Sequence, residues 1–175
     1  MISVTLKILN DLEKTSRLYW NISRESAQFL NLLIKDRKYK TVLEIGSSSG
    51  YSGIWLAEAL SHTDGHLYTM ESHKKNRFAL GEESFKKSGL KKHITHILGH
   101  APEDLPKTPK YFDLAFFDAT KEEYFSYFNS LKNRIKKGGM IIADNLHSHP
   151  KPLKNFVTAI NHEPNWKVYN LNIGT

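Results

Sequence analysis

Cysteine is absent from the 175-residue sequence, which excludes disulfide bonds, cysteine–zinc sites and a catalytic thiol. The sequence also lacks an apolar run long enough to cross a membrane. Charged side chains interrupt the first twenty residues, so this stretch does not resemble a secretory signal. We therefore expect a cytoplasmic protein without a membrane partner, and the length predicts a single domain over residues 1–175.

Basic residues outnumber acidic ones, 25 to 18, which gives a formal net charge of +7 and a pI near 9.4. One explanation is that lysine and arginine are favoured in the last turn of helices. The other is attraction of an anionic partner, such as RNA, a phosphorylated substrate or a CoA ester. The basic side chains come in short clusters, at residues 35–40, 74–77, 86–92 and 132–137.

Segments with helical periodicity alternate with short apolar segments along the chain. This alternation predicts an α/β fold with a doubly wound, mostly parallel sheet and helices on both faces. Ligands bind such sheets where the strand order reverses, here beyond the ends of strands 41–45 and 112–117. The expected helices are 3–17, one that follows Ser23 as its N-cap, 51–61, 74–88, one through 124–135 and one around 153–160; the expected strands are 41–45, 66–71, 93–98, 112–117, 140–143 and 166–171.

A turn with two glycines follows the first expected strand, in the sequence VLEIGSSSGYS. A turn between a strand and a helix places backbone N–H groups and a helix N-terminus beside one spot, which suits a nucleotide-like ligand. Gly46 and Gly50 are four residues apart, whereas a dinucleotide fingerprint reads G-x-G-x-x-G. A nicotinamide-dependent dehydrogenase is therefore the least favoured enzyme class.

An acidic residue, Glu71, ends the second expected strand, about twenty residues after Gly50. A carboxylate at this distance can accept hydrogen bonds from both hydroxyls of a ribose. The alternative is an ordinary exposed glutamate at a strand end.

Oxygen-bearing side chains follow two further strands. Asp118 comes directly after the apolar segment 112–117, and Asp144 and Asn145 follow segment 140–143. If these strands are neighbours, two carboxylates and an amide oxygen converge, a set that suits Mg²⁺ or Ca²⁺. The alternative for Asp118 is a cap on the helix that follows it.

The three segments LEIGSSSGYS, FDLAFFDATKEEY and GGMIIADN resemble the hallmark segments of metal-dependent O-methyltransferases of the catechol and caffeoyl-CoA type. The resemblance covers most of the chain, from about Asn21 to Asn145. It implies a Rossmann-like class I methyltransferase fold, with N-terminal helices in residues 1–38 and the core in 39–175. It also implies S-adenosylmethionine (SAM) and a divalent metal, most simply Mg²⁺, as cofactors.

The resemblance assigns roles residue by residue. It implies a metal site at Asp118, Asp144 and Asn145, and it makes Lys121 the catalytic general base. A divalent ion acidifies and orients the acceptor oxygens, so that the base can remove a proton and the oxyanion can attack the methyl group. The implied SAM contacts are Asn21, Ile22, Glu44, Gly46, Ser48, Gly50, Tyr51, Ser52, Glu71, Ser72, Ala101 and Asp118.

Departures from the family pattern lie beside the expected site and at the C-terminus. His100 stands where many relatives carry Asp, Asn or a small residue, and His147 and His149 follow the metal pair, where they either reach the acceptor or belong to a polar loop. The family's sheet ends in an antiparallel hairpin, and here only its first arm, residues 167–171, precedes the last residue. An incomplete C-terminal strand leaves an open sheet edge, which we expect a homodimer to cover.

Three functions remain open. The first is O-methylation of a small catechol-like or polyhydroxylated acceptor. The second is methylation of wobble hydroxyuridine in tRNA by the same fold, which the basic charge favours. The third is SAM binding without catalysis, against which the intact residues Asp118, Lys121, Asp144 and Asn145 argue.

Overall fold

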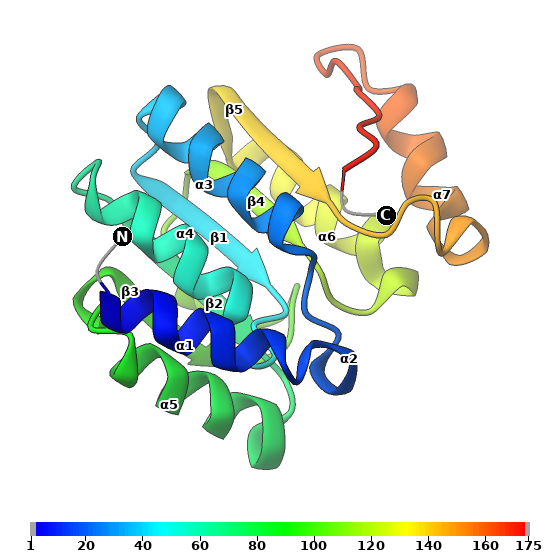
Figure 1. Ribbon diagram of the computed structural model, residues 1–175. Coiled ribbons are helices and arrows are strands. Elements are labelled where there is room, and N and C mark those ends of the chain that lie inside the picture. The colour runs from blue at the N-terminus through cyan, green and yellow to red at the C-terminus, as the bar shows by residue number, and fades with distance from the viewer. Residues whose placement is uncertain (1–2, 174–175) are drawn as a thin grey trace.

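The computed structural model describes residues 3–173. Its centre is a parallel sheet with the strand order β3-β2-β1-β4-β5 (Figure 1). This order reverses at β1, so the crevice beyond the ends of β1 and β4 is the expected ligand position. The strands are β1 (Thr41–Ile45), β2 (His66–Glu71), β3 (Ile94–Leu98), β4 (Phe112–Phe117) and β5 (Ile135–Ala143). The predicted doubly wound α/β fold is confirmed.

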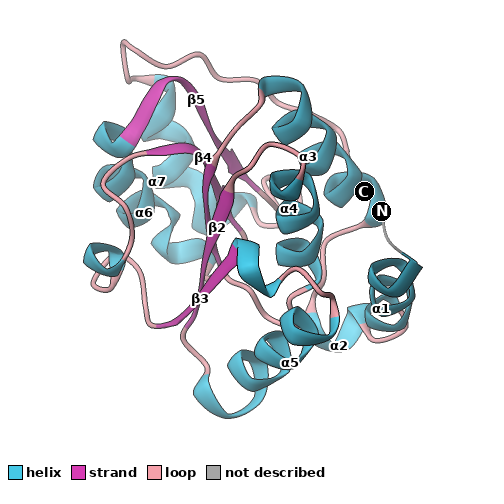
Figure 2. Cartoon of the chain, turned by 90° about the vertical axis from the view of Figure 1, so that its left-hand side faces the viewer, coloured by secondary structure: helices cyan, strands magenta, loops and turns pink. Residues whose placement is uncertain are grey.

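Helices cover both faces of the sheet, as Figure 2 shows with the sheet seen nearly edge-on. The helices are α1 (Ser3–Glu13), α2 (Ser16–Tyr19), α3 (Arg24–Arg37), α4 (Tyr51–Ser61), α5 (Ala79–Lys87), α6 (Tyr124–Leu131) and α7 (Pro150–Asn161). One apolar cluster joins α1, α3, α4 and α5 to one face, and a second joins α6 and α7 to the other. No helix within residues 3–173 has the length and apolarity needed to span a bilayer.

Side chains alternate between the two apolar clusters along the central strands. On β1, Val42 faces the cluster that contains α3 and α4, and Leu43 faces the cluster that contains α6 and α7. Leu114 and Ala115 divide in the same way on β4. Because both faces are covered, these strands are almost continuously apolar, as their sequences predicted.

Several element boundaries differ from the sequence-based expectation. The helix expected over 3–17 is divided into α1 and α2, and the one expected over 74–88 opens with a π-helical turn, η1 (Lys74–Phe78), before α5. The last strand of the sheet, β5, begins at Ile135 and not at Met140, because a register irregularity between Phe112 and Leu114 accommodates the glycines before Met140.

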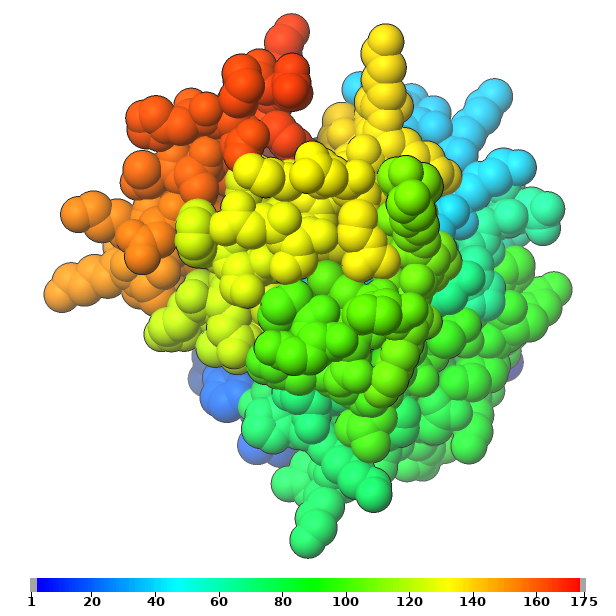
Figure 3. All heavy atoms as spheres, turned by 180° about the vertical axis from the view of Figure 1, so that it is seen from behind, coloured from blue at the N-terminus to red at the C-terminus, as the bar shows by residue number. Residues whose placement is uncertain are grey.

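The strand expected over residues 166–171 was wrong, because this segment has no regular structure and pairs with no other strand. Trp166 packs against Phe128 with ring centroids 5.6 Å apart, whereas Tyr169 and Leu171 are exposed. An alternating pattern provides strand propensity, but a strand also needs a partner for its backbone groups. The segment after α7 lies on the surface beside the part of the chain that contains β5 (Figure 3). Within the described residues, the outer edge of β5 is therefore unpaired.

Candidate active site

A cavity of about 540 Å³ lies at the carboxyl edge of the sheet. Its walls come from residues 19–26, the turn after β1, the segments after β2 and β3, and the ends of β4 and β5. Eleven of the predicted site residues line it: Asn21, Ile22, Gly46, Ser48, Glu71, Ser72, Ala101, Asp118, Lys121, Asp144 and Asn145.

The turn after β1 has a backbone that only glycine can adopt at its first position. Gly46 has φ +100°, and a Cβ added there would lie 2.2 Å from the backbone oxygen of Asp118. This close approach results from hydrogen bonds that extend the sheet: Gly46 N donates to Met70 O, and Asp118 N donates to Ile45 O, each at 3.0 Å. The turn is thus held directly against the ends of β2 and β4.

The same turn is joined to the segment between α2 and α3. Ser48 Oγ donates to the backbone oxygen of Tyr19 at 2.8 Å, and Ser49 Oγ donates to Asn21 Oδ1 at 2.7 Å. These two bonds bring residues 19–21 onto one wall of the cavity, although the segments are almost thirty residues apart.

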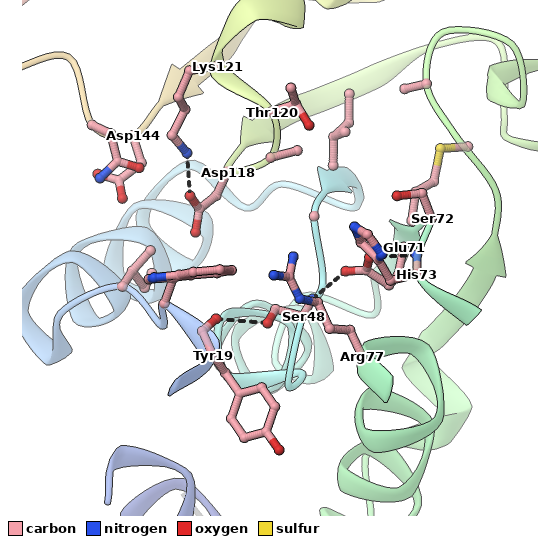
Figure 4. A pocket seen from close by; sticks show the side chains of 18 of the residues that line it. Tyr19, Ser48, Glu71, Ser72, His73, Arg77, Asp118, Thr120, Lys121 and Asp144 are labelled. Carbon is pink, nitrogen blue, oxygen red and sulfur yellow. Dashed lines mark hydrogen bonds and ion pairs between the residues drawn. The ribbon is translucent and has the colours of Figure 1, made fainter. Parts of the chain in front are cut away.

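Glu71 lines the cavity beside the same turn. Its Oε2 accepts from Ser48 N at 2.9 Å, and its Oε1 accepts from His73 N at 2.9 Å. The side chain is buried, and the two bonds fix the carboxylate plane at the cavity (Figure 4). Carboxylate oxygens have further lone pairs, so Glu71 can still accept hydrogen bonds from a ligand.

At the far side of the cavity, Lys121 lies beside Asp118 (Figure 4). Lys121 Nζ is 3.0 Å from Asp118 Oδ1 and donates to Tyr124 Oη at 3.1 Å. Tyr124 Oη in turn donates to Phe117 O at 2.9 Å, which fixes the ring below the lysine. Lys121 and Asp118 expose only 14% and 15% of their side chains, so the pair faces the cavity and little else.

Burial raises the pKa of Asp118, and the nearby carboxyl of Asp144 raises it further, while Lys121 opposes both. Asp144 and Asn145 follow the end of β5, which pairs with β4. Two carboxylates and an amide oxygen thus line the cavity, and Lys121 forms an ion pair with one of these carboxylates.

This donor set suits a hard divalent cation in both ligand type and charge. The third donor is an amide, and no group of three or more His, Asp or Glu side chains in residues 3–173 is placed to hold a metal.

Four predicted cofactor residues lie outside the cavity lining: Glu44, Gly50, Tyr51 and Ser52. Glu44 is fully buried and its Oε2 accepts from Thr69 Oγ1 at 2.5 Å. Burial raises its pKa to about 7, against the opposing hydrogen bonds from Ser52 and Thr69. Tyr51 Oη donates to Glu13 Oε1 at 2.6 Å, on the side of α1. These residues therefore belong to the packing around the turn after β1 and not to the wall of the cavity.

The three histidines that the sequence left open separate into two groups. His100 and His149 line the cavity, whereas His147 lies outside its lining. His100 Nε2 is 3.0 Å from Glu123 Oε1, and the His149 ring is 2.9 Å from Ser148 Oγ.

Sequence reasoning missed several residues that line the cavity, among them His73, Arg77 and Tyr127. Arg77 belongs to a basic cluster, but nothing in the sequence distinguishes it from Lys74 and Lys75 beside it. The sequence left Tyr19 and Trp20 open between an acceptor pocket and the core, and both line the cavity.

Comparisons with known proteins agree with this geometry. Residues 3–161 match the O-methyltransferase family. A catechol O-methyltransferase from Niastella koreensis is 32% identical over 145 residues, which cover 81% of this chain and 65% of the relative. Caffeoyl-CoA O-methyltransferase 2 from Populus trichocarpa is 35% identical over 142 residues, covering 76% of this chain and 57% of the relative. The chain thus spans less than two thirds of the length of these curated relatives.

Solved structures show the same fold. One is an O-methyltransferase from Bacillus cereus in complex with SAH (S-adenosylhomocysteine). It has a TM-score of 0.82 and 25% identity, and the match covers 94% of this chain and 81% of that chain. SAH-bound methyltransferase PaMTH1 from Podospora anserina has a TM-score of 0.84 and 24% identity, with the same coverage. The match over residues 3–161, together with the five-stranded sheet, shows that this chain belongs to the O-methyltransferase family and has the Rossmann-like class I methyltransferase fold.

Proposed function

We propose that this protein is a SAM-dependent O-methyltransferase that methylates a hydroxyl of a small polyhydroxylated acceptor. The observation that carries the proposal is that one cavity joins the turn after β1 and Glu71 to Asp118, Lys121, Asp144 and Asn145. The first group suits an adenosyl cofactor and the second suits a hydroxyl that must lose a proton. Similarity to the Bacillus cereus enzyme in complex with SAH supports the cofactor.

In this proposal the cofactor lies along the ends of β1 and β2. Glu71 accepts from the ribose hydroxyls, and the turn at Gly46 and Ser48 brings backbone groups close to the ligand. Ala101 is buried in the wall and offers an apolar surface to the adenine. Asn21 and Ile22 lie where the methionine end would reach α3.

SAM supplies a methyl group bonded to a positively charged sulfur. Only the neutral amine of Lys121 can accept a proton, and a divalent ion held by Asp118 would favour this form by repelling the ammonium. The amine would then take the proton of the acceptor hydroxyl, and the acceptor oxygen would bond to the methyl carbon as the carbon–sulfur bond breaks with its electron pair on sulfur. The protein mainly aligns oxygen, carbon and sulfur, and such alignment provides a large part of the acceleration. Asp118 holds Lys121 at 3.0 Å and thereby orients the base toward the cavity.

We further propose that Asp118, Asp144 and Asn145 hold Mg²⁺. The ion would supply positive charge that acidifies and orients the acceptor hydroxyl. The support is the carboxyl of Asp118, whose pKa is raised by burial and by the neighbouring Asp144 and lowered by Lys121, so that a further cation beside it would stabilise its charged form.

The test is methyl transfer from labelled SAM to a panel of catechols, with SAH binding measured in parallel by calorimetry. We expect transfer that EDTA abolishes and added Mg²⁺ restores, and Asp118→Asn should remove both the activity and the response to Mg²⁺. Full activity in EDTA would contradict the metal site. Tight SAH binding without transfer to any acceptor would favour a non-catalytic SAM-binding protein.

A second candidate function, methylation of tRNA, is favoured by cations beside the cavity. Lys74, Lys151 and Lys154 are exposed near cavity-lining residues, and none has an ion pair within the part of the chain that the structure describes. Incorporation of label into bulk tRNA but not into catechols would support this candidate, and a steep fall with salt would accompany it.

A cytoplasmic location and a homodimer complete the proposal. A sequence without cysteine suits a reducing compartment, and the unpaired edge of β5 offers a surface for a second copy. Light scattering that gives the mass of a monomer at micromolar concentration would contradict the homodimer.

A further inference from the structure

Trp20 and Arg77 meet at the cavity from two distant segments. Trp20 ends α2 and Arg77 belongs to the π-helical turn η1, and both line the cavity. The guanidinium carbon of Arg77 lies 4.7 Å from the centre of the Trp20 ring, a cation–π contact. The reaction outlined above uses neither residue.

The backbone at Trp20 is held in place, and 70% of the residue is exposed. Its neighbours on both sides are bonded to the turn after β1, through Tyr19 O and Asn21 Oδ1. Trp20 itself has a left-handed backbone, with φ 53°, and its N–H donates to Ser16 O. The backbone of Trp20 is therefore held beside the turn after β1, and its exposed aromatic ring is available to a ligand.

Arg77 is a cation without a carboxylate partner. No ion pair joins it to any residue between 3 and 173, yet its guanidinium stays charged under all ordinary conditions. Its side chain reaches into the pocket in Figure 4, and no hydrogen bond joins the guanidinium to any residue between 3 and 173. The N–H groups at the edge of the guanidinium remain free, and their planar arrangement matches carboxylate and phosphate groups.

The backbone around Arg77 is anchored. Its neighbour Phe78 stacks on His96, with ring centroids 4.0 Å apart and planes at 20°. His96 is buried and lies 2.9 Å from Ser47 Oγ of the cofactor turn. π-Helical turns often occur at functional sites, where they aim one side chain out of the regular helical path.

The cofactor's own carboxylate has another place in this cavity. Ile22, Ser23 and Ser26 line the wall where the fourteen-residue helix α3 begins. A helix N-terminus attracts an anionic group through its unpaired N–H groups and its dipole. Arg77 is therefore available to a second anion, and the second ligand of a methyl-transfer site is the acceptor.

We propose that Arg77, held on Trp20, binds an anionic group of the methyl acceptor and so selects hydroxylated acids over neutral catechols. The anionic group is a carboxylate or a phosphate, because both fit the guanidinium edge. This inference rests on the proposed methyl-transfer function and names the substrate class of the same site.

The experiment compares 3,4-dihydroxybenzoate, its phosphate-bearing counterpart 3,4-dihydroxyphenyl phosphate, and neutral catechol. Binding to the SAH-loaded protein in Mg²⁺ is measured by calorimetry, and kcat/KM for methylation is measured with SAM. We expect the wild-type protein to bind at least one of the two anions about tenfold or more tightly than catechol. Arg77→Gln should remove this preference, a loss of about tenfold to a hundredfold, and leave catechol almost unchanged. The more affected anion identifies the natural group.

Three further variants separate the contact from general charge. Lys75→Gln removes a cation from the same turn at a position outside the cavity lining and should keep the preference. Trp20→Phe keeps an aromatic face and should keep most of it, whereas Trp20→Ala should lose it. Circular dichroism checks that each variant is folded.

The outcomes distinguish this inference from the proposed function. Equal binding of all three compounds by the wild-type protein, or an equal loss in Arg77→Gln and Lys75→Gln, would overturn the role of Arg77. A raised Kd for SAH in Arg77→Gln, without a change in acceptor preference, would assign Arg77 to the cofactor and also overturn it. Failure of the wild-type protein to bind SAH would overturn the proposed function itself.

Discussion

The two sides of the cavity are built in different ways. The proposed cofactor side consists of a backbone turn and a buried carboxylate that are held by hydrogen bonds: Gly46 N donates to β2, and Glu71 accepts from Ser48 N of the turn. The proposed acceptor side adds to the groups at the strand ends several partly exposed side chains from short helices and connections, such as Trp20, Arg77 and His149. A site made of backbone tolerates few residue types, whereas a site made of exposed side chains can be altered without disturbing the fold.

The difference predicts where substitutions act. On the cofactor side, a change should lower stability and cofactor affinity together. On the acceptor side, a change should alter the choice of acceptor and leave the free energy of unfolding nearly constant.

The largest effect is expected for Gly46→Ala. The added Cβ would lie 2.2 Å from Asp118 O, and φ +100° is unfavourable for alanine, so β1 and β4 must separate. We expect a loss of about 3 kcal/mol or more in the free energy of unfolding and no measurable SAH binding. Gly89→Ala is the control, because its φ of +75° carries strain alone, with nothing within 4 Å of the added Cβ. That variant should lose about 1 kcal/mol and bind SAH normally.

Lys121→Gln tests the boundary between the two sides. The lysine touches Asp118 but lies outside the buried core, so stability and SAH affinity should change little. Loss of a general base lowers kcat by about a hundredfold to ten-thousandfold. Lys132→Gln, which removes a lysine that pairs with Glu163 away from the cavity, is the matched control. Equal kcat values for the two variants would show that Lys121 is not the base.

Glu44→Gln probes the buried support of the cofactor turn. Burial raises the pKa of Glu44 from its ordinary value of 4.5 to about 7. Between pH 4.5 and about pH 7, the folded protein therefore keeps a proton that the unfolded chain has lost. The contribution of Glu44 to the free energy of unfolding is therefore fully present below pH 4.5 and decreases as the pH rises through about 7. The difference amounts to about 3 kcal/mol.

Urea unfolding of the wild-type and Glu44→Gln proteins from pH 4 to pH 8 measures the contribution of Glu44. The remaining carboxyl groups affect the pH dependence of stability almost equally in both proteins, so the difference between the two curves isolates Glu44. The variant should gain stability relative to the wild-type protein as the pH rises. Parallel curves would mean that Glu44 titrates alike in the folded and unfolded states.

The same contrast explains how much could be predicted from sequence. The strand alternation, the turn at Gly46 and the carboxylates at strand ends follow local rules, and their predicted positions agree with the structure. The position of a residue in a motif does not show which way its side chain points. Glu44 stands in the motif around Gly46, yet its side chain lies outside the cavity and accepts a hydrogen bond from Thr69. Which way a strand residue faces depends on the register of the sheet.

The acceptor side could not be derived from sequence because it depends on contacts between distant segments. Trp20 and Arg77 are 57 positions apart, and no local pattern indicates that they touch. The segment 166–171 failed for a related reason, since its alternation is typical of a strand but its partner strand is missing within residues 3–173. Long-range pairing is a property of the fold and not of the segment.

The smallest effect is expected at His100, where the two sides meet. His100 lines the cavity next to Ala101, and its ring lies 3.0 Å from Glu123 Oε1. The two side chains are 45% and 34% exposed, and exposed ion pairs contribute at most about 1 kcal/mol. His100→Gln should therefore change the free energy of unfolding by less than about 0.5 kcal/mol and the Kd of SAH by less than about threefold. A tenfold weaker SAH complex in calorimetry would instead place His100 against the adenine, and it would make this segment part of the cofactor side. The segment after β3 thus decides where the boundary between the two sides lies, because Ala101 is buried in the cavity wall and His100 beside it is exposed.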